Sequence, residues 1–109
     1  RVISIQVKTK TRGTWQTSTT RGKRRRAPEA ETKYWVFVDL GPERPEFYIV
    51  PKWWIENDIF KAHNRYLKEF GGHRAKNDAS THHAIPAARI AEWRDQWQIL
   101  DIFNKRHQS

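Results

Sequence analysis

The chain has 109 residues and carries 21 Lys and Arg against 12 Asp and Glu, which gives a formal charge of +9. Its length predicts a single domain over residues 1–109, and its six Trp, five Phe and three Tyr supply the apolar area of a folded core. The lack of Cys excludes disulfides and thiolate metal sites and favours a reducing, cytoplasmic location. No apolar run reaches the length of a membrane span, and the clustered positive charge predicts a polyanionic partner, which favours nucleic acid.

The first predicted element is a strand over residues 2–8. Its side chains alternate, with Ile3, Ile5 and Val7 on one face and Ser4, Gln6 and Lys8 on the other. This period of two is typical of a half-buried strand. The chain begins at Arg1, inside the strand pattern, so we expect that an upstream part of a longer protein is missing and that the domain is truncated at its N-terminus.

Residues 9–33 are polar and basic, with a short strand or hairpin arm predicted within 15–20. The run 21–26 is predicted to be an exposed, mobile loop. Guanidinium groups pair with phosphates in a bidentate manner, so this region is predicted to contact nucleic acid. The predicted contacts are Arg12, Arg21, Lys23, Arg24, Arg25, Arg26 and Lys33. A solvated charge run or a localisation-type patch is the alternative.

The most apolar part of the chain predicts a β-hairpin. Residues 34–40 are apolar on both faces, as in a strand that is covered on both sides. A turn over 41–45 leads to a second strand over 46–50, and the short link predicts antiparallel pairing. Pro51 ends this strand and opens a helix over 52–70, which Gly71 and Gly72 stop.

A polar connection over 73–84 precedes the last predicted helix, near 86–98, and the tail from Lys105 is predicted to fray. The buried stripe of this helix is Ile90, Trp93, Trp97 and Leu100. Adjacent His82 and His83 point apart in any regular structure, so we predict no histidine metal site. The elements together predict an α/β fold with a mixed sheet and flanking helices.

Gln6 and Lys8 are the candidate catalytic residues, because period two places both side chains on one face of a strand. The amide oxygen of Gln6 is a candidate ligand for a divalent cation. The ammonium of Lys8 is suited to orient a water molecule or to stabilise charge on a phosphate. An ordinary strand with a polar outer face is the alternative.

Several segments resemble the PD-(D/E)XK, or restriction-endonuclease-like, nuclease superfamily, whose small bacterial members have this order of elements. The segments are 5–9 (IQVKT), 34–40, 45–51 and 90–100, and by element order they cover about four fifths of the chain. The resemblance implies a restriction-endonuclease-like fold, Mg²⁺ as cofactor and hydrolysis of DNA phosphodiester bonds. It also implies that Lys8 is the motif lysine and that Gln6 stands at the acidic motif position, as a metal ligand.

Two features depart from that motif. Gln6 is neutral and supplies a poorer Mg²⁺ ligand than a carboxylate, and the acidic residue of the preceding strand has no counterpart in this chain. Residues 1–109 alone are therefore predicted to cleave little or no DNA.

Other functions stay open. One is a non-catalytic DNA- or protein-binding module derived from the nuclease fold, and another is an unrelated basic α/β RNA-binding domain. A second copy of the chain is also a candidate partner, since residues 2–8 otherwise form an unprotected sheet edge.

Overall fold

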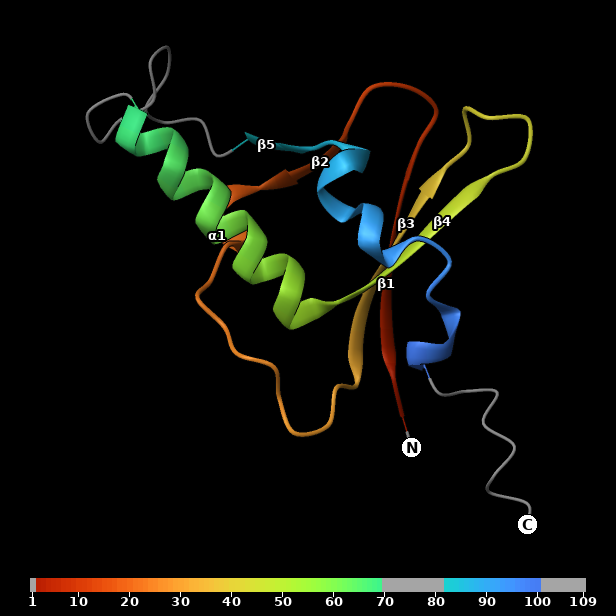
Figure 1. Cartoon of the computed structure of the whole chain (residues 1–109), viewed down its shortest axis with the longest axis horizontal. Coiled ribbons are helices and arrows are strands. Elements are labelled where there is room, and N and C mark those ends of the chain that lie inside the picture. Colours follow the sequence, from red (N-terminus) through yellow and green to blue (C-terminus); the bar gives the residue numbers. More distant parts are fainter. Residues whose placement is uncertain (1, 70–81, 101–109) are drawn as a thin grey trace.

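The structure is a computed structural model that describes residues 2–69 and 82–100. Three strands form a mixed sheet in the order β1-β3-β4, and two more form an antiparallel ribbon (Figure 1). The strands are β1 (Ser4–Lys10), β2 (Trp15–Ser18), β3 (Lys33–Asp39), β4 (Glu46–Pro51) and β5 (His82–Ile85). The helices are α1 (Lys52–Glu69) and the 3₁₀ helices η1 (Thr19–Arg21), η2 (Ala87–Trp93) and η3 (Trp97–Leu100).

The central strand of the sheet is β3, whose residues 34–38 are buried. It pairs in parallel with β1, from Ser4 beside Lys33 to Lys10 beside Asp39, and antiparallel with β4. The predicted hairpin, the strand near residues 2–8 and the mixed sheet of an α/β fold are therefore confirmed. The predicted helix after Pro51 is confirmed as α1 up to Glu69; its predicted end at Gly71 lies outside the described residues.

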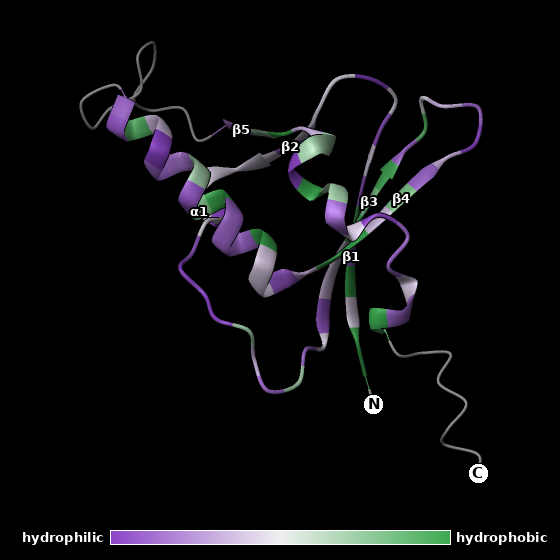
Figure 2. Cartoon of the chain, viewed as in Figure 1, coloured by the Kyte–Doolittle hydropathy of each residue, from purple (hydrophilic) through white to green (hydrophobic). Residues whose placement is uncertain are grey.

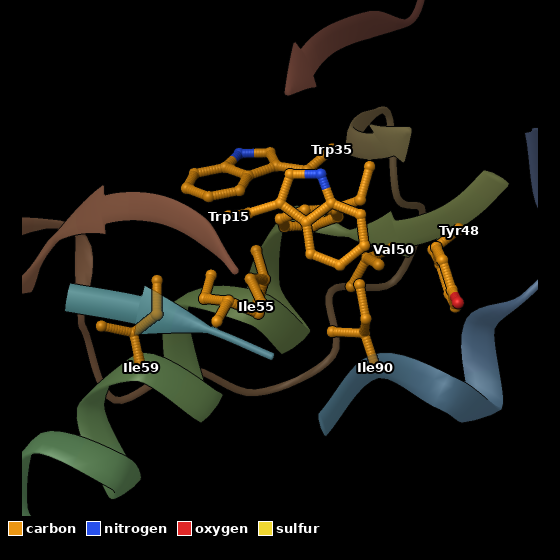
Figure 3. Close-up of a cluster of buried hydrophobic side chains, with 9 residues drawn as sticks. Trp15, Trp35, Tyr48, Val50, Ile55, Ile59 and Ile90 are labelled. Carbon is orange, nitrogen blue, oxygen red and sulfur yellow. The ribbon is translucent and has the colours of Figure 1, made fainter. Parts of the chain in front are cut away.

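The main core lies on one face of the sheet, where α1, the β2–β5 ribbon and η2 cover β3 and β4 (Figure 3). Its buried members are Trp15, Trp35, Phe37, Tyr48, Val50, Ile55, Ile59, Ile85 and Ile90. The ring of Trp15 meets those of Phe37 and Tyr48 edge-on, at centroid distances of 5.2 and 5.5 Å, and its Nε1 donates to the carbonyl of Val38 at 3.1 Å. Trp15 thus joins the ribbon to the sheet through both packing and a buried hydrogen bond.

A second, smaller core lies on the opposite face, and it explains why the predicted last helix is wrong. It contains Tyr34, Val36, Val38, Ile49 and Leu100. The expected helix is split into η2 and η3 by extended Arg94 and by Asp95, whose φ is 55°. The backbone N–H of Asp95 donates a hydrogen bond to the carbonyl of Phe47, and this bond directs the chain past the edge of β4. Ile90 and Leu100 therefore enter different cores instead of sharing one helical stripe.

The burial of β1 is the reverse of the pattern expected for a half-buried strand. The side chains of Ile5 and Val7 are 43 % and 59 % exposed, whereas Lys8 and Lys10 are half-buried. The register places Gln6 beside Trp35 and Lys8 beside Phe37, so the polar row of β1 shares the face of the main core. Among the described residues β1 is an edge strand, and the predicted pairing with a second copy stays a prediction.

Candidate nucleic-acid interface

Lys8 is held in the corner between β1 and β2. Its Nζ donates a hydrogen bond to the carbonyl oxygen of Gln16 at 3.2 Å. The same atom lies 5.5 Å from the ring centroid of Trp35, within range of a cation–π interaction. The strand geometry that the sequence predicted therefore brings Lys8 to the main-core face, where an aromatic ring and a backbone carbonyl fix its position.

The charge of Lys8 is not neutralised by a carboxylate within residues 2–69 and 82–100. Burial, and then the nearby guanidinium of Arg21, lower the pKa of Lys8 below its ordinary value. Both causes disfavour the protonated form, because water is partly removed and a like charge is close. An anion placed beside Lys8 and Arg21 would attract both cations and favour the protonated form of Lys8, so this corner is suited to bind a negatively charged group.

Gln6 lies on the same face of β1, two residues before Lys8, and its side chain is exposed. It lines a cavity of about 180 Å³ at the start of β1 and β3, where α1 also begins. The lining residues are Ser4, Ile5, Gln6, Lys33, Tyr34, Trp35 and Lys52. Two lysines thus line this cavity, and Gln6 lies between the cavity and Lys8 along β1.

The Mg²⁺ position expected at Gln6 stays a prediction. Mg²⁺ favours near-octahedral oxygen coordination that includes carboxylates. Within the described residues, no group of three or more His, Asp or Glu side chains is arranged to hold a metal ion. Asp39 is on the face of Gln6 but four residues along the sheet, about 13 Å away at the rise of a strand. Its carboxylate already accepts hydrogen bonds from Lys10 and from the amide of Gly41.

The basic run 21–26 lies against α1 and is mostly hydrophilic in Figure 2. Its residues other than Gly22 are exposed as predicted, and residues 22–25 make contacts to the helix. The backbone N–H of Lys23 donates to the carbonyl of Glu56 at 3.0 Å. Gly22 is so close to α1 that a Cβ there would lie 2.9 Å from the backbone nitrogen of Phe60. The loop is therefore anchored on the helix.

The predicted phosphate contacts of this run have different surroundings. Arg25 forms an ion pair within the fold, because its Nε lies 3.0 Å from Oε1 of Glu56, whose side chain is only 6 % exposed. Arg24 lies over the ring of Phe60 at 5.5 Å. Lys23 and Arg26 are exposed. Arg25 thus supports the loop, and the remaining cations of the run present their charge to solvent.

The structure does not gather all the predicted contacts into one patch. Lys33 pairs with Ser4 at one end of the sheet, whereas Arg12 follows Lys10 at the other. These ends are about 20 Å apart. Lys52 was not among the contacts predicted from the sequence. The hairpin register indicates its position, because Tyr34 pairs with Pro51 and so places the start of α1 beside the start of β3.

Comparison of the chain with family models, curated proteins and solved structures found no match. The PD-(D/E)XK resemblance therefore stays a prediction that rests on the quoted segments. Within residues 2–69 and 82–100, none of the helices has the length and apolar character needed to cross a membrane.

Proposed function

We propose that this chain is a nucleic-acid-binding domain that contacts DNA phosphates with the face of β1 that carries Gln6 and Lys8. The observation that carries the proposal is the Lys8–Arg21 corner. There the ammonium of Lys8 is half-buried against Trp35, the guanidinium of Arg21 acts on it as a like charge, and neither forms an ion pair with a carboxylate of the described residues. Two like charges repel each other, and the negative charge of a bound phosphate would offset that repulsion.

The arrangement of further cations supports a phosphate chain rather than a single small anion. The cavity that contains Lys33 and Lys52 lies at the start of β1. Ser4, which pairs with Lys33, is four residues before Lys8 on that strand. This spacing corresponds to about 13 Å, over which one strand of B-DNA presents about four phosphates along its axis. The net charge of +9 adds long-range attraction for a polyanion.

The test measures affinity of the chain for a fluorescent 20-base-pair duplex over a series of salt concentrations. We expect Lys8→Ala to weaken binding about tenfold at low salt and to reduce the salt slope by about one, because one phosphate contact is lost. Arg44→Ala is the matched control, since Arg44 is an exposed cation in the β3–β4 turn. Equal losses in the two variants would contradict a specific contact at Lys8.

A second candidate function is Mg²⁺-dependent hydrolysis of DNA, as the resemblance implies. The observation that favours it is that Gln6 and Lys8 lie on one face of an edge strand, as the motif requires. When bound, Mg²⁺ would supply Lewis-acid activation of a phosphate. A carboxylate from outside the described residues is needed beside Gln6. Lys8 would stabilise negative charge on the phosphate.

Catalysis is tested with plasmid and single-stranded DNA in the presence of Mg²⁺ or Mn²⁺. We expect residues 1–109 to cleave little or no DNA, and Gln6→Glu to bind Mn²⁺ more tightly than the parent because it adds a carboxylate. Titration calorimetry measures that affinity. Unchanged Mn²⁺ binding in Gln6→Glu would contradict a metal position at Gln6. Cleavage that is equal in the parent and in Lys8→Ala would exclude Lys8 from the reaction.

A further inference from the structure

The cavity at the start of β1 and β3 combines positive charge with an open, surface-accessible shape. Its volume is about 180 Å³, and it is lined by the lysines Lys33 and Lys52, the polar side chains of Ser4 and Gln6, and aromatic residues of β3. Lys33 is exposed and forms no ion pair within the described residues. The cavity therefore offers a free ammonium beside hydroxyl and amide groups that can donate hydrogen bonds.

The second lysine is only partly neutralised. Nζ of Lys52 lies 3.7 Å from Oε2 of Glu56, beyond ordinary hydrogen-bond distance, while the other oxygen of Glu56 accepts a hydrogen bond from Arg25 at 3.0 Å. Glu31, next to the cavity in the chain, is also engaged, because its carboxylate accepts hydrogen bonds from the backbone nitrogens of Thr32, Lys33 and Trp53. The acidic groups that flank the lysines thus already have other partners.

We propose that this cavity binds the terminal phosphomonoester of a nucleic-acid strand. The inference rests on the proposed function and gives it a substrate class, namely strands with a phosphorylated end. Gln6 connects the two parts, because it lines the cavity and lies on the same strand face as Lys8. A strand that enters the cavity with its terminal phosphate continues over the Lys8–Arg21 corner with its phosphodiesters.

The charge of the ligand explains why a terminal phosphate suits the cavity better than a phosphodiester. A phosphodiester has one negative charge, whereas a phosphomonoester has about −1.5 to −2 near pH 7 and three terminal oxygens that accept hydrogen bonds. Two lysines match the dianion in charge.

The experiment compares the affinity of the chain for one eight-nucleotide DNA with a 5′-phosphate, a 3′-phosphate or only hydroxyl ends. We expect one phosphorylated end to bind about tenfold more tightly than the hydroxyl ends at low salt. The preference should shrink at pH 5, because the second ionisation of a phosphomonoester has a pKa of about 6. The arm that binds more tightly identifies which end enters the cavity.

The decisive variant is Lys33→Gln combined with Lys52→Gln. We expect it to lose the preference for a phosphorylated end, so that the ratio of its affinities for the phosphorylated and the hydroxyl-ended strand falls from about tenfold to about one, whatever the affinity for each strand. Lys33→Gln alone changes an exposed side chain and preserves the test if the double variant fails to fold. Arg44→Gln with Lys68→Gln is the control that removes the same charge from exposed positions elsewhere.

Two results would overturn the inference. One is equal affinity of the parent for all three strands, and the other is a phosphate preference that survives in the double variant. The affinity of Lys8→Ala for the hydroxyl-ended strand tests the proposed function independently of either result. Failure of the cavity proposal is therefore distinct from failure of the proposed function.

Discussion

Lys8 and Lys10 are the same residue type on the same face of one strand, yet their surroundings differ in one respect. Nζ of Lys10 lies 4.7 Å from the ring centroid of Trp15, and Nζ of Lys8 lies 5.5 Å from that of Trp35. Lys10 also forms an ion pair with Asp39 at 2.9 Å, whereas the one hydrogen-bond partner of Lys8 within residues 2–69 and 82–100 is a backbone carbonyl. With similar aromatic contacts, the presence or absence of a carboxylate separates a structural lysine from one available to a ligand.

The same contrast extends to the two ends of the sheet. At the Lys10 end, Arg94 forms an ion pair with Glu46 at 3.2 Å, and the hydroxyl of Tyr48 lies 3.4 Å from Oε1 of Glu46. The named charges at this end are thus paired within the fold. At the other end, Lys33 has no such partner among the described residues, and Lys52 shares Glu56 with Arg25. The two ends therefore differ in whether these lysines are paired with a carboxylate.

Breaking the aromatic support of the Lys10 end should have the largest effect. Trp15 is 1 % exposed, and Trp15→Ala removes its packing and its hydrogen bond to Val38. We expect a loss of about 3–5 kcal/mol in the free energy of unfolding, measured by urea denaturation. Trp97→Ala, at a side chain that is 37 % exposed, is the control. A smaller loss for Trp15→Ala than for Trp97→Ala would contradict the assignment of the main core.

The ion pair of the Lys10 end should contribute less. Lys10, and then the amide of Gly41, hold the pKa of Asp39 below its ordinary value. A lowered carboxyl pKa stabilises the fold above the unfolded-state pKa, and this contribution disappears as pH falls through the folded-state pKa. We expect Asp39→Asn to cost about 1–3 kcal/mol at pH 7.

The pH dependence checks the cause of that loss. Urea denaturation at pH 7 and at progressively lower pH should show the difference between parent and Asp39→Asn shrinking below about pH 4, where the unfolded carboxyl is protonated. A difference that stays constant over the whole range would show that the carboxylate charge is not what stabilises this end.

The basic loop should give the smallest effect. Arg24 and Arg26 are exposed, whereas Arg25 is held by Glu56. Arg24→Ala with Arg26→Ala should reduce the slope of log affinity against log salt for duplex DNA by about one to two. The control is Arg65→Ala with Lys68→Ala, which removes two exposed cations of α1. An unchanged slope in the loop variant would show that the loop does not contact phosphates.

The local features of the fold follow from short-range patterns, and the sequence predicts them well. The apolar residues 34–38 and the turn after Asp39 predict the β3–β4 hairpin, and Pro51 marks the start of α1. The pairing of β2 with β5 depends instead on residues 64 or more positions apart, and no local pattern encodes it. The break at Asp95 also escapes prediction, because Trp93 and Trp97 fit helical spacing whether or not the chain turns between them.

The sequence predicted that Gln6 and Lys8 share one face of β1, but not what surrounds them. Alternation along residues 2–8 correctly places Gln6 and Lys8 on one face. Which face is covered depends on the ribbon and on Trp35, so the exposure of Ile5 and Val7 was not foreseen. Glu56 as the partner of Arg25 was equally hidden, since the two residues meet only in the folded chain.

If Lys8 binds DNA and Lys10 stabilises the fold, crossed measurements on Lys8→Met and Lys10→Met will separate the two roles. Burial and Arg21 lower the pKa of Lys8, so protonation of Lys8 does not stabilise the fold. The free energy of unfolding of the parent, compared with that of Lys8→Met, should therefore rise as pH increases towards the ordinary lysine pKa. We expect Lys8→Met to change the free energy of unfolding at pH 7 by less than about 1 kcal/mol and to weaken duplex binding about tenfold. Lys10→Met should lose about 1–3 kcal/mol of stability and keep the binding of the parent at temperatures where it is folded. Lys8→Met that destabilises the fold as much as Lys10→Met, with no specific loss of DNA binding, would contradict the account.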